Sequence, residues 1–225
     1  MDDTISSHLD DDFDAAWQTV GQQYQPAIFV TSALIKLSGA GERPVEVERL
    51  ATASGRPVDE TLALARQFLK VKIQDGLIHL DLSAAGPSAR YRLQIGARTI
   101  DADGCAPDII WTALLADKPI HAEATCPATG TPIRVDLTPE GVERVEPPST
   151  VIAVISPLAP QLQQLSSGEQ ADVDVCAHQP FFASAEAAAE WQAQHPGGRI
   201  YPISEFVAWW RRFLTAQNVD IFYDH

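Results

Sequence analysis

The chain is poor in cysteine and in basic residues, and it has no long apolar run. Three cysteines in 225 residues are few and odd in number, which argues against the disulfide scaffold of a secreted protein. The 16 basic against 30 acidic side chains give a net charge of −14, and a field of that sign repels nucleic-acid phosphates and anionic lipid surfaces. No stretch reaches the length of a membrane span. We therefore expect neither a nucleic-acid nor a membrane partner.

Several common catalytic motifs are also missing. The sequence holds no glycine-rich phosphate loop, no Gly-x-Ser-x-Gly elbow and no His-Glu-x-x-His pair. The segment Met1–Phe13 is acidic and polar, the opposite of an export signal. Together with the small number of cysteines, this favours a reducing cytoplasm, where thiols are free to act as ligands or nucleophiles.

The hydrophobic content of 45% and the charged content of 20% are those of a globular protein. An acidic lead and a helix over about 13–37, interrupted near Pro26, make up residues 1–40. Residues 41–85 contain two segments of helical spacing, followed by a hairpin with Asp75-Gly76 as its turn. That order is the outline of a winged helix.

A DNA-binding winged helix would carry basic residues where its second helix enters the groove. Here that helix opens with Asp59 and Glu60, which would face phosphates with carboxylates. A structural module is therefore the favoured interpretation of residues 41–85. A metal-responsive winged-helix regulator remains as an alternative function.

Residues 86–225 are expected to form one further domain of short antiparallel strands surrounded by helices, so the predicted fold class is α+β. We expect strands over 91–95, 121–126, 133–137, 151–155 and 171–176. A helix follows Cys105, another begins at Ser184, and the last runs over about 204–214 with its aromatic residues in the core.

Cys105 lies where a helix is expected to begin. Gly104 interrupts the preceding segment, Pro107 suits a first helical turn, and an apolar run at helical spacing starts at Ile109. The amide N–H groups and the positive dipole end of a helix N-terminus favour a thiolate. Asp108 falls in the same first turn, close enough to interact with the sulfur. Beside a thiolate such a carboxyl can hold a proton and deliver it, although a first-turn acid also simply complements the dipole.

Cys176 follows a predicted strand, at the end of an element as Cys105 is. Two thiolates that meet in space make a soft site, which prefers large thiophilic ions to magnesium or calcium. Cys126 stands in a turn without a second cysteine pair, so we interpret it as structural. The histidines at 79, 121 and 178 lack partners at metal-binding spacing.

Four blocks of the sequence, in order and spacing, resemble the signatures of the organomercurial (alkylmercury) lyases. The blocks are Cys105-Ala106-Pro107-Asp108, Cys126-Pro127-Ala128-Thr129-Gly130-Thr131-Pro132, Val145-Glu146-Pro147 and Cys176-Ala177-His178-Gln179-Pro180-Phe181-Phe182-Ala183-Ser184. The resemblance extends from about Arg43 to the C-terminal helix.

Two positions depart from the family pattern: Gly104 stands where members usually have an aromatic residue, and Ala177 where some have a cysteine. We expect Gly104 to loosen the loop or enlarge the pocket.

The resemblance implies mercury resistance by protonolysis of a carbon–mercury bond, without an organic cofactor. Cys105, Cys176 and Asp108 would form the site for the mercury of substrate and product, with the two cysteines as thiolates, and Asp108 would also manage the proton. Cys126 would match a structural family cysteine. The implied partners are an organomercurial, low-molecular-weight thiols needed for turnover, and a mercuric reductase that accepts the product.

One alternative keeps the same scaffold but not the reaction. Such a protein would bind a soft metal, copper or mercury, or carry out other thiol chemistry without cleaving carbon–mercury bonds. Tight metal binding with no hydrocarbon released would distinguish it from a lyase.

Overall fold

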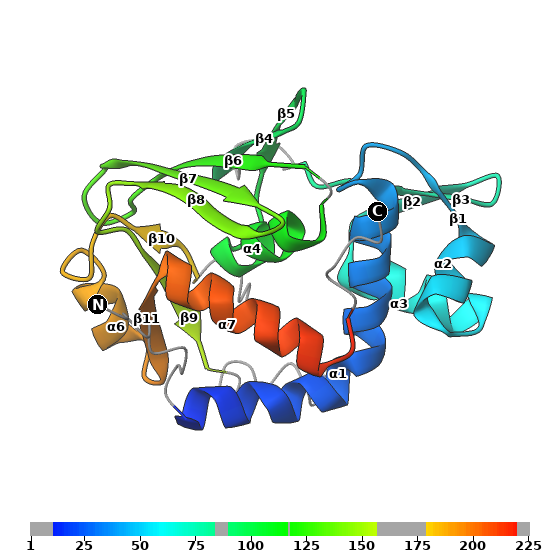
Figure 1. The fold of residues 1–225 in the computed structure, drawn as a ribbon, viewed down its shortest axis with the longest axis horizontal. Coiled ribbons are helices and arrows are strands. Elements are labelled where there is room, and N and C mark those ends of the chain that lie inside the picture. The colour runs from blue at the N-terminus through cyan, green and yellow to red at the C-terminus, as the bar shows by residue number, and fades with distance from the viewer. Residues whose placement is uncertain (1–10, 84–89, 117, 157–178, 220–225) are drawn as a thin grey trace.

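The helices and strands of the chain form an α+β fold, as the sequence predicts (Figure 1). The computed structural model describes residues 11–83, 90–116, 118–156 and 179–219. The helices are α1 (Asp11–Ser38), α2 (Val47–Ser54), α3 (Val58–Phe68), α4 (Ala106–Leu115), α6 (Ala189–Gln194) and α7 (Ile203–Ala216). The strands are β1 (Val45–Glu46), β2 (Val71–Gln74), β3 (Leu77–Leu80), β4 (Tyr91–Ile95), β5 (Arg98–Ala102), β6 (Ile120–Thr125), β7 (Pro132–Thr138), β8 (Gly141–Glu146), β9 (Val151–Ile155), β10 (Phe181–Phe182) and β11 (Gly198–Pro202).

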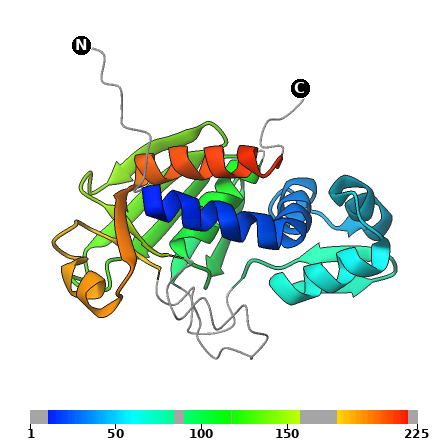
Figure 2. The ribbon, with the colours of Figure 1, turned by 90° about the horizontal axis from the view of Figure 1, so that it is seen from below.

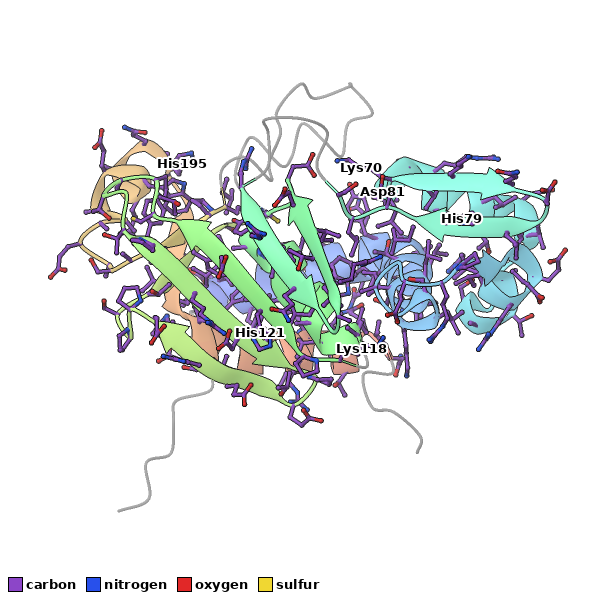
Figure 3. The ribbon with its side chains drawn as sticks, turned by 90° about the horizontal axis from the view of Figure 1, so that it is seen from above. Lys70, His79, Asp81, Lys118, His121 and His195 are labelled. Carbon is purple, nitrogen blue, oxygen red and sulfur yellow. The ribbon has the colours of Figure 1, made fainter. Side chains whose placement is uncertain are left out.

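The largest sheet has the strand order β5-β4-β6-β7-β8, and every neighbouring pair is antiparallel. Side chains along β4 alternate, with Tyr91, Leu93 and Ile95 buried and Arg92 and Gln94 exposed. This period of two makes one face apolar and one polar. Helix α4 packs against β7 and α7 against β8, while the face turned to the viewer in Figure 3 is lined with polar side chains.

Helix α1 is continuous through Pro26, whereas the sequence pattern predicts an interruption there. Proline has no N–H to donate and its ring collides with the preceding turn, so a helix that continues past it bends. Figures 1 and 2 show α1 changing direction part-way along its length. The bend lets one helix pack on both α7 and the α2–α3 pair.

Aromatic side chains join α1 to α7. The buried Trp209 ring contacts Phe13 and Trp17 of α1 at centroid distances of 5.4 and 6.2 Å. Its Nε1 donates a hydrogen bond of 2.7 Å to Asp14 Oδ1. Figure 2 shows the two helices side by side in front of the large sheet. The aromatic residues of the last helix are therefore core residues, as predicted.

Residues 45–80 form a small module of two helices and a three-stranded sheet, in the order β1-β3-β2. Its β2–β3 hairpin turns at Asp75 and Gly76, with φ angles of 52° and 75°. Both central residues of a type I′ turn need positive φ, which Asp-Gly supplies. The predicted hairpin is thus confirmed, whereas the winged-helix interpretation and the domain boundaries stay predictions.

A second sheet, β10-β9-β11, carries the fully buried strand β9 at its centre. The sequence pattern predicts β9 but not its two neighbours. The helix expected to begin at Ser184 begins at Ala189; Ser184 Oγ instead accepts the N–H of Ala187 in the preceding turn. The strand predicted over 171–176 lies outside the described residues.

Asp136 of β7 is a buried carboxylate held by two basic side chains. It accepts hydrogen bonds from Arg134 Nε at 2.9 Å and from His121 Nδ1 at 2.9 Å, and its side chain is 7% exposed. Burial raises the pKa of Asp136, but the hydrogen bonds from Arg134 and His121 outweigh it, so the net pKa lies below the usual 3.8. Figure 3 shows His121 on the polar face of the sheet.

The lowered pKa of Asp136 predicts a defined dependence of stability on pH. A depressed carboxyl pKa stabilises the fold above the unfolded value of 3.8, and this contribution disappears as pH falls through the folded value. We expect Asp136→Asn to lower the free energy of unfolding by about 1–2 kcal/mol near about pH 6, and the difference to vanish toward about pH 2. Urea unfolding across this range measures it. The exposed Glu143→Gln on β8 is the control, and an equal deficit for Asp136→Asn at every pH would contradict the assignment.

Within the described ranges, no helix combines the length and hydropathy that a bilayer span requires.

Candidate active site

Cys105 is the N-cap residue of α4, as the sequence predicts. Its backbone is extended (φ −98°, ψ 166°), and Pro107 lies in the first turn of the helix that follows. Cys105 N–H donates to Asp108 Oδ2 at 3.0 Å, so the side chain of the third helical residue reaches back to the cap. Because this bond closes the N-terminus, the positions of residues 105 and 108 are fixed relative to each other.

The thiol of Cys105 donates to the same carboxylate oxygen. The distance from Sγ to Asp108 Oδ2 is 3.1 Å. Cys105 is 3% exposed, and Asp108 is half-buried. A thiol in contact with a carboxylate can pass its proton across the hydrogen bond, which leaves a thiolate beside a carboxylic acid. The predicted contact is thus present, and it has the geometry that proton transfer requires.

Gln179 provides a second set of contacts at the start of α4. Its backbone carbonyl accepts the N–H of Ala106 at 2.9 Å. Its side-chain Nε2 lies 3.9 Å from Cys105 Sγ, and its Oε1 accepts the N–H of Ile155, on β9, at 3.0 Å. Gln179 therefore joins the helix carrying the cysteine to the second sheet.

Asp108 borders an apolar cavity of about 390 Å³. One wall is the bent helix α1, which contributes Trp17, Tyr24 and Ile28, and another is α4, which contributes Trp111. The carboxyl group therefore stands between the buried cysteine and a space that fits a small apolar ligand. An acid at the edge of such a space can protonate a group bound within it.

Among the described residues, four charged side chains line this cavity: Lys70, Asp81, Asp103 and Asp108. Lys70 Nζ pairs with Asp103 Oδ2 at 2.7 Å, and its backbone carbonyl accepts the N–H of Asp81. Figure 3 shows Lys70 and Asp81 on these adjoining segments. Hydrogen bonds from the hydroxyl and backbone N–H of Ser83 lower the pKa of Asp81. Three carboxylates against one ammonium make the cavity favourable to a cation.

Gly104 also lines the cavity. A Cβ placed on it would lie 3.2 Å from Asp108 Oδ2, closer than most such contacts. A side chain at position 104 would therefore press on the acid and take space from the cavity. The expectation that Gly104 loosens the loop or enlarges the pocket stays a prediction, and this close approach is consistent with the second effect.

Cys126 lies apart from this constellation, in the turn that ends β6. It is 1% exposed, its N–H donates to the carbonyl of Thr131, and its carbonyl accepts the N–H of Gly130. Burial raises the pKa of the Cys126 thiol, but hydrogen bonds from the Thr129 side chain and nearby backbone N–H groups outweigh it, so the net pKa is lowered. The structural role of Cys126 stays a prediction.

Cys176 and His178 lie outside the described residues, so the pairing of Cys105 with Cys176 also stays a prediction. Among the residues that are described, no group of three or more His, Cys, Asp or Glu side chains is placed to hold a metal ion.

Three features of the site are not visible in the sequence pattern: the contact of Gln179 with Cys105, the Lys70–Asp103 pair and the α1 wall. The first two join residues 74 and 33 positions apart. For Gln179, the one signal in the sequence is its position three residues after Cys176.

Comparison with known proteins identifies the family of the chain. The sequence model of the alkylmercury lyase family matches residues 85–214, which include Cys105, Asp108 and Cys176. The chain belongs to the alkylmercury lyase family. Among its relatives, the alkylmercury lyase of Pseudomonas putida is 30% identical over 171 residues, covering 72% of this chain and 72% of that protein. The alkylmercury lyase of Bacillus cereus is 28% identical over 166 residues, covering 74% and 72%.

A solved structure shares the fold. The mercury-bound form of MerB2 superposes with a TM-score of 0.55 at 19% identity, over 92% of this chain and 98% of that one. By family, the chain is an alkylmercury lyase enzyme. The matched residues begin at 85, so α1 and α3, which also line the cavity, precede the family match.

Proposed function

We propose that the chain cleaves the carbon–mercury bond of organomercurials by protonolysis. The observation that carries the proposal is the Cys105 thiol on the Asp108 carboxylate, at the edge of an apolar cavity, 3.1 Å from sulfur to oxygen. The names of its relatives and the mercury-bound MerB2 structure agree with mercury as the metal concerned.

The proposed steps balance without a redox change. An organomercurial R–Hg–X reacts with the thiols of Cys105 and Cys176, and the products are R–H, HX and mercury(II) bound to the two sulfurs. Asp108 takes the proton of Cys105 and delivers it to the carbon as the carbon–mercury bond breaks. The two thiolates donate electron density to mercury, which weakens its bond to carbon.

Covalent geometry supports a joint role for the two cysteines. Gln179 contacts Cys105 through its side chain and the next residue, Ala106, through its backbone carbonyl. Only three peptide units link Gln179 to Cys176, and three such units span at most about 11 Å. This short length of chain is compatible with binding of one metal ion by the sulfurs of both Cys105 and Cys176.

The cavity supports the choice of substrate. Its apolar walls would bind the organic group, and its excess of carboxylates suits the positive charge of mercury. Release of the product requires external thiols, so the proposal includes a reducing cytoplasm and a mercuric reductase that accepts the metal.

Incubation of the purified protein with phenylmercury or methylmercury and excess thiol tests the proposal. We expect benzene or methane in the headspace, in proportion to the mercury(II) recovered as thiol complex. Mercury or copper bound tightly with no hydrocarbon formed would favour the alternative of a soft-metal binding protein. Salt-sensitive binding to DNA without hydrocarbon would favour the regulator.

A further inference from the structure

We propose that Gln179 is a positioning residue whose carboxamide holds the Cys105 sulfur and stabilises its negative charge. The proposal rests on the protonolysis function for its meaning, but the contacts that carry it are independent of the substrate. Gln179 is 7% exposed, so its amide groups depend on protein partners rather than water.

The orientation of the amide follows from its partner on β9. The N–H of Ile155 can only donate a hydrogen bond, and it lies 3.0 Å from Oε1. The oxygen of the carboxamide must therefore face Ile155. The NH₂ group is consequently the one directed at Cys105 Sγ, at 3.9 Å, a long contact that suits the large sulfur atom.

The two partners of the sulfur have opposite roles. Asp108 Oδ2 accepts a hydrogen bond from the thiol, so Asp108 takes the proton as the thiolate forms. The Gln179 NH₂ can only donate, so its interaction with sulfur strengthens when the sulfur becomes negative. Because the sulfur is buried, a fixed donor replaces the water that would otherwise solvate the charge.

Gln179 also contacts the backbone at the start of α4. Its carbonyl accepts the N–H of Ala106, in the first turn of α4. One residue thus binds the start of the cysteine's helix, the cysteine's sulfur and the central strand of the second sheet. The sulfur is held between an acid on its own helix and an amide from another part of the chain.

Two variants separate the NH₂ group that donates to Cys105 from the oxygen that accepts the N–H of Ile155. Gln179→Glu keeps an oxygen for the Ile155 N–H but, when ionised, offers the sulfur no donor. Gln179→Met has a similar length and provides neither group. We expect both to slow alkylation of Cys105 by iodoacetamide by about 5- to 20-fold, measured by mass spectrometry of the Cys105 peptide. The kcat for hydrocarbon release should fall by a similar factor, with KM little changed.

Gln217→Met is the matched control, because Gln217 is an equally buried amide that donates to Gln18 of α1. It should leave the alkylation of Cys105 unchanged. Thermal unfolding of each variant reports the structural part of the effect, which should be larger for Met than for Glu because only Met leaves the Ile155 N–H without an acceptor. Alkylation of Cys105 at the wild-type rate in both Gln179 variants would overturn the proposal. Slower alkylation in a protein that releases no hydrocarbon would instead retain the role of Gln179 and reject the proposed lyase reaction.

Discussion

Asp108→Asn is expected to lower the rate of hydrocarbon release by about 10²- to 10⁴-fold, the usual contribution of a positioned general acid. The wild-type carboxylate accepts two hydrogen bonds at Oδ2, from the N–H and from the thiol of Cys105, and in the proposed reaction it also takes up the thiol proton. An asparagine oxygen can still accept the N–H, so the helix start should persist. The amide cannot hold and deliver the proton that the carbon requires. Gas chromatography of the headspace under single-turnover conditions measures the effect.

Mercury binding provides the control for this variant. Because both cysteines remain, Asp108→Asn should still take up the organomercurial, and its thermal unfolding should stay close to that of the wild type. The expected product is a protein that holds R–Hg without releasing R–H. Release of hydrocarbon by Asp108→Asn at a rate near that of the wild type would remove Asp108 from the mechanism.

Trp209→Ala is expected to produce the largest loss of stability, about 3–5 kcal/mol. The indole is 2% exposed, so its removal leaves a cavity in the aromatic core. The substitution also removes the hydrogen bond from Nε1 to Asp14 Oδ1. Since these contacts join α7 to α1, both helices should loosen together. Urea unfolding followed by circular dichroism gives the free energy directly.

Two further substitutions on α7 separate the loss of buried volume from the loss of the hydrogen bond to Asp14. Trp209→Phe keeps most of the apolar volume but not the hydrogen bond, and should cost less than Trp209→Ala. Arg212→Ala, on the exposed side of the helix, should change stability by less than about 0.5 kcal/mol. A cost for Trp209→Ala no larger than that for Arg212→Ala would mean that α1 does not depend on this contact.

The features that the sequence predicts well are local. The Asp75-Gly76 hairpin, the start of α4 directly after Cys105 and the contact of Asp108 with Cys105 all join residues within a few positions of each other. Turn chemistry and helix geometry determine such contacts without reference to the rest of the chain. The order of residues therefore suffices to place the acid beside the thiol.

The features that the sequence does not predict depend on pairing partners. Strand β8 has exposed or half-buried side chains along its whole length, so it lacks the alternation of a half-buried strand and owes its structure to the ladder with β7. Strand β10 has only two residues and forms against β9. Gln179 precedes β10, and its place beside Cys105 follows from that pairing rather than from any motif.

The cavity is lined partly by residues that the family model matches and partly by residues of α1 that precede them. The thiol and the acid belong to the part of the chain that the family model matches, whereas Trp17, Tyr24 and Ile28 precede it. Because α1 contributes apolar side chains to the cavity but none of the proposed reacting groups, we expect substitutions on α1 to change which organic groups fit without changing the bond-breaking residues. Exchange of α1 between relatives would then transfer the range of accepted substrates while leaving the reacting groups untouched.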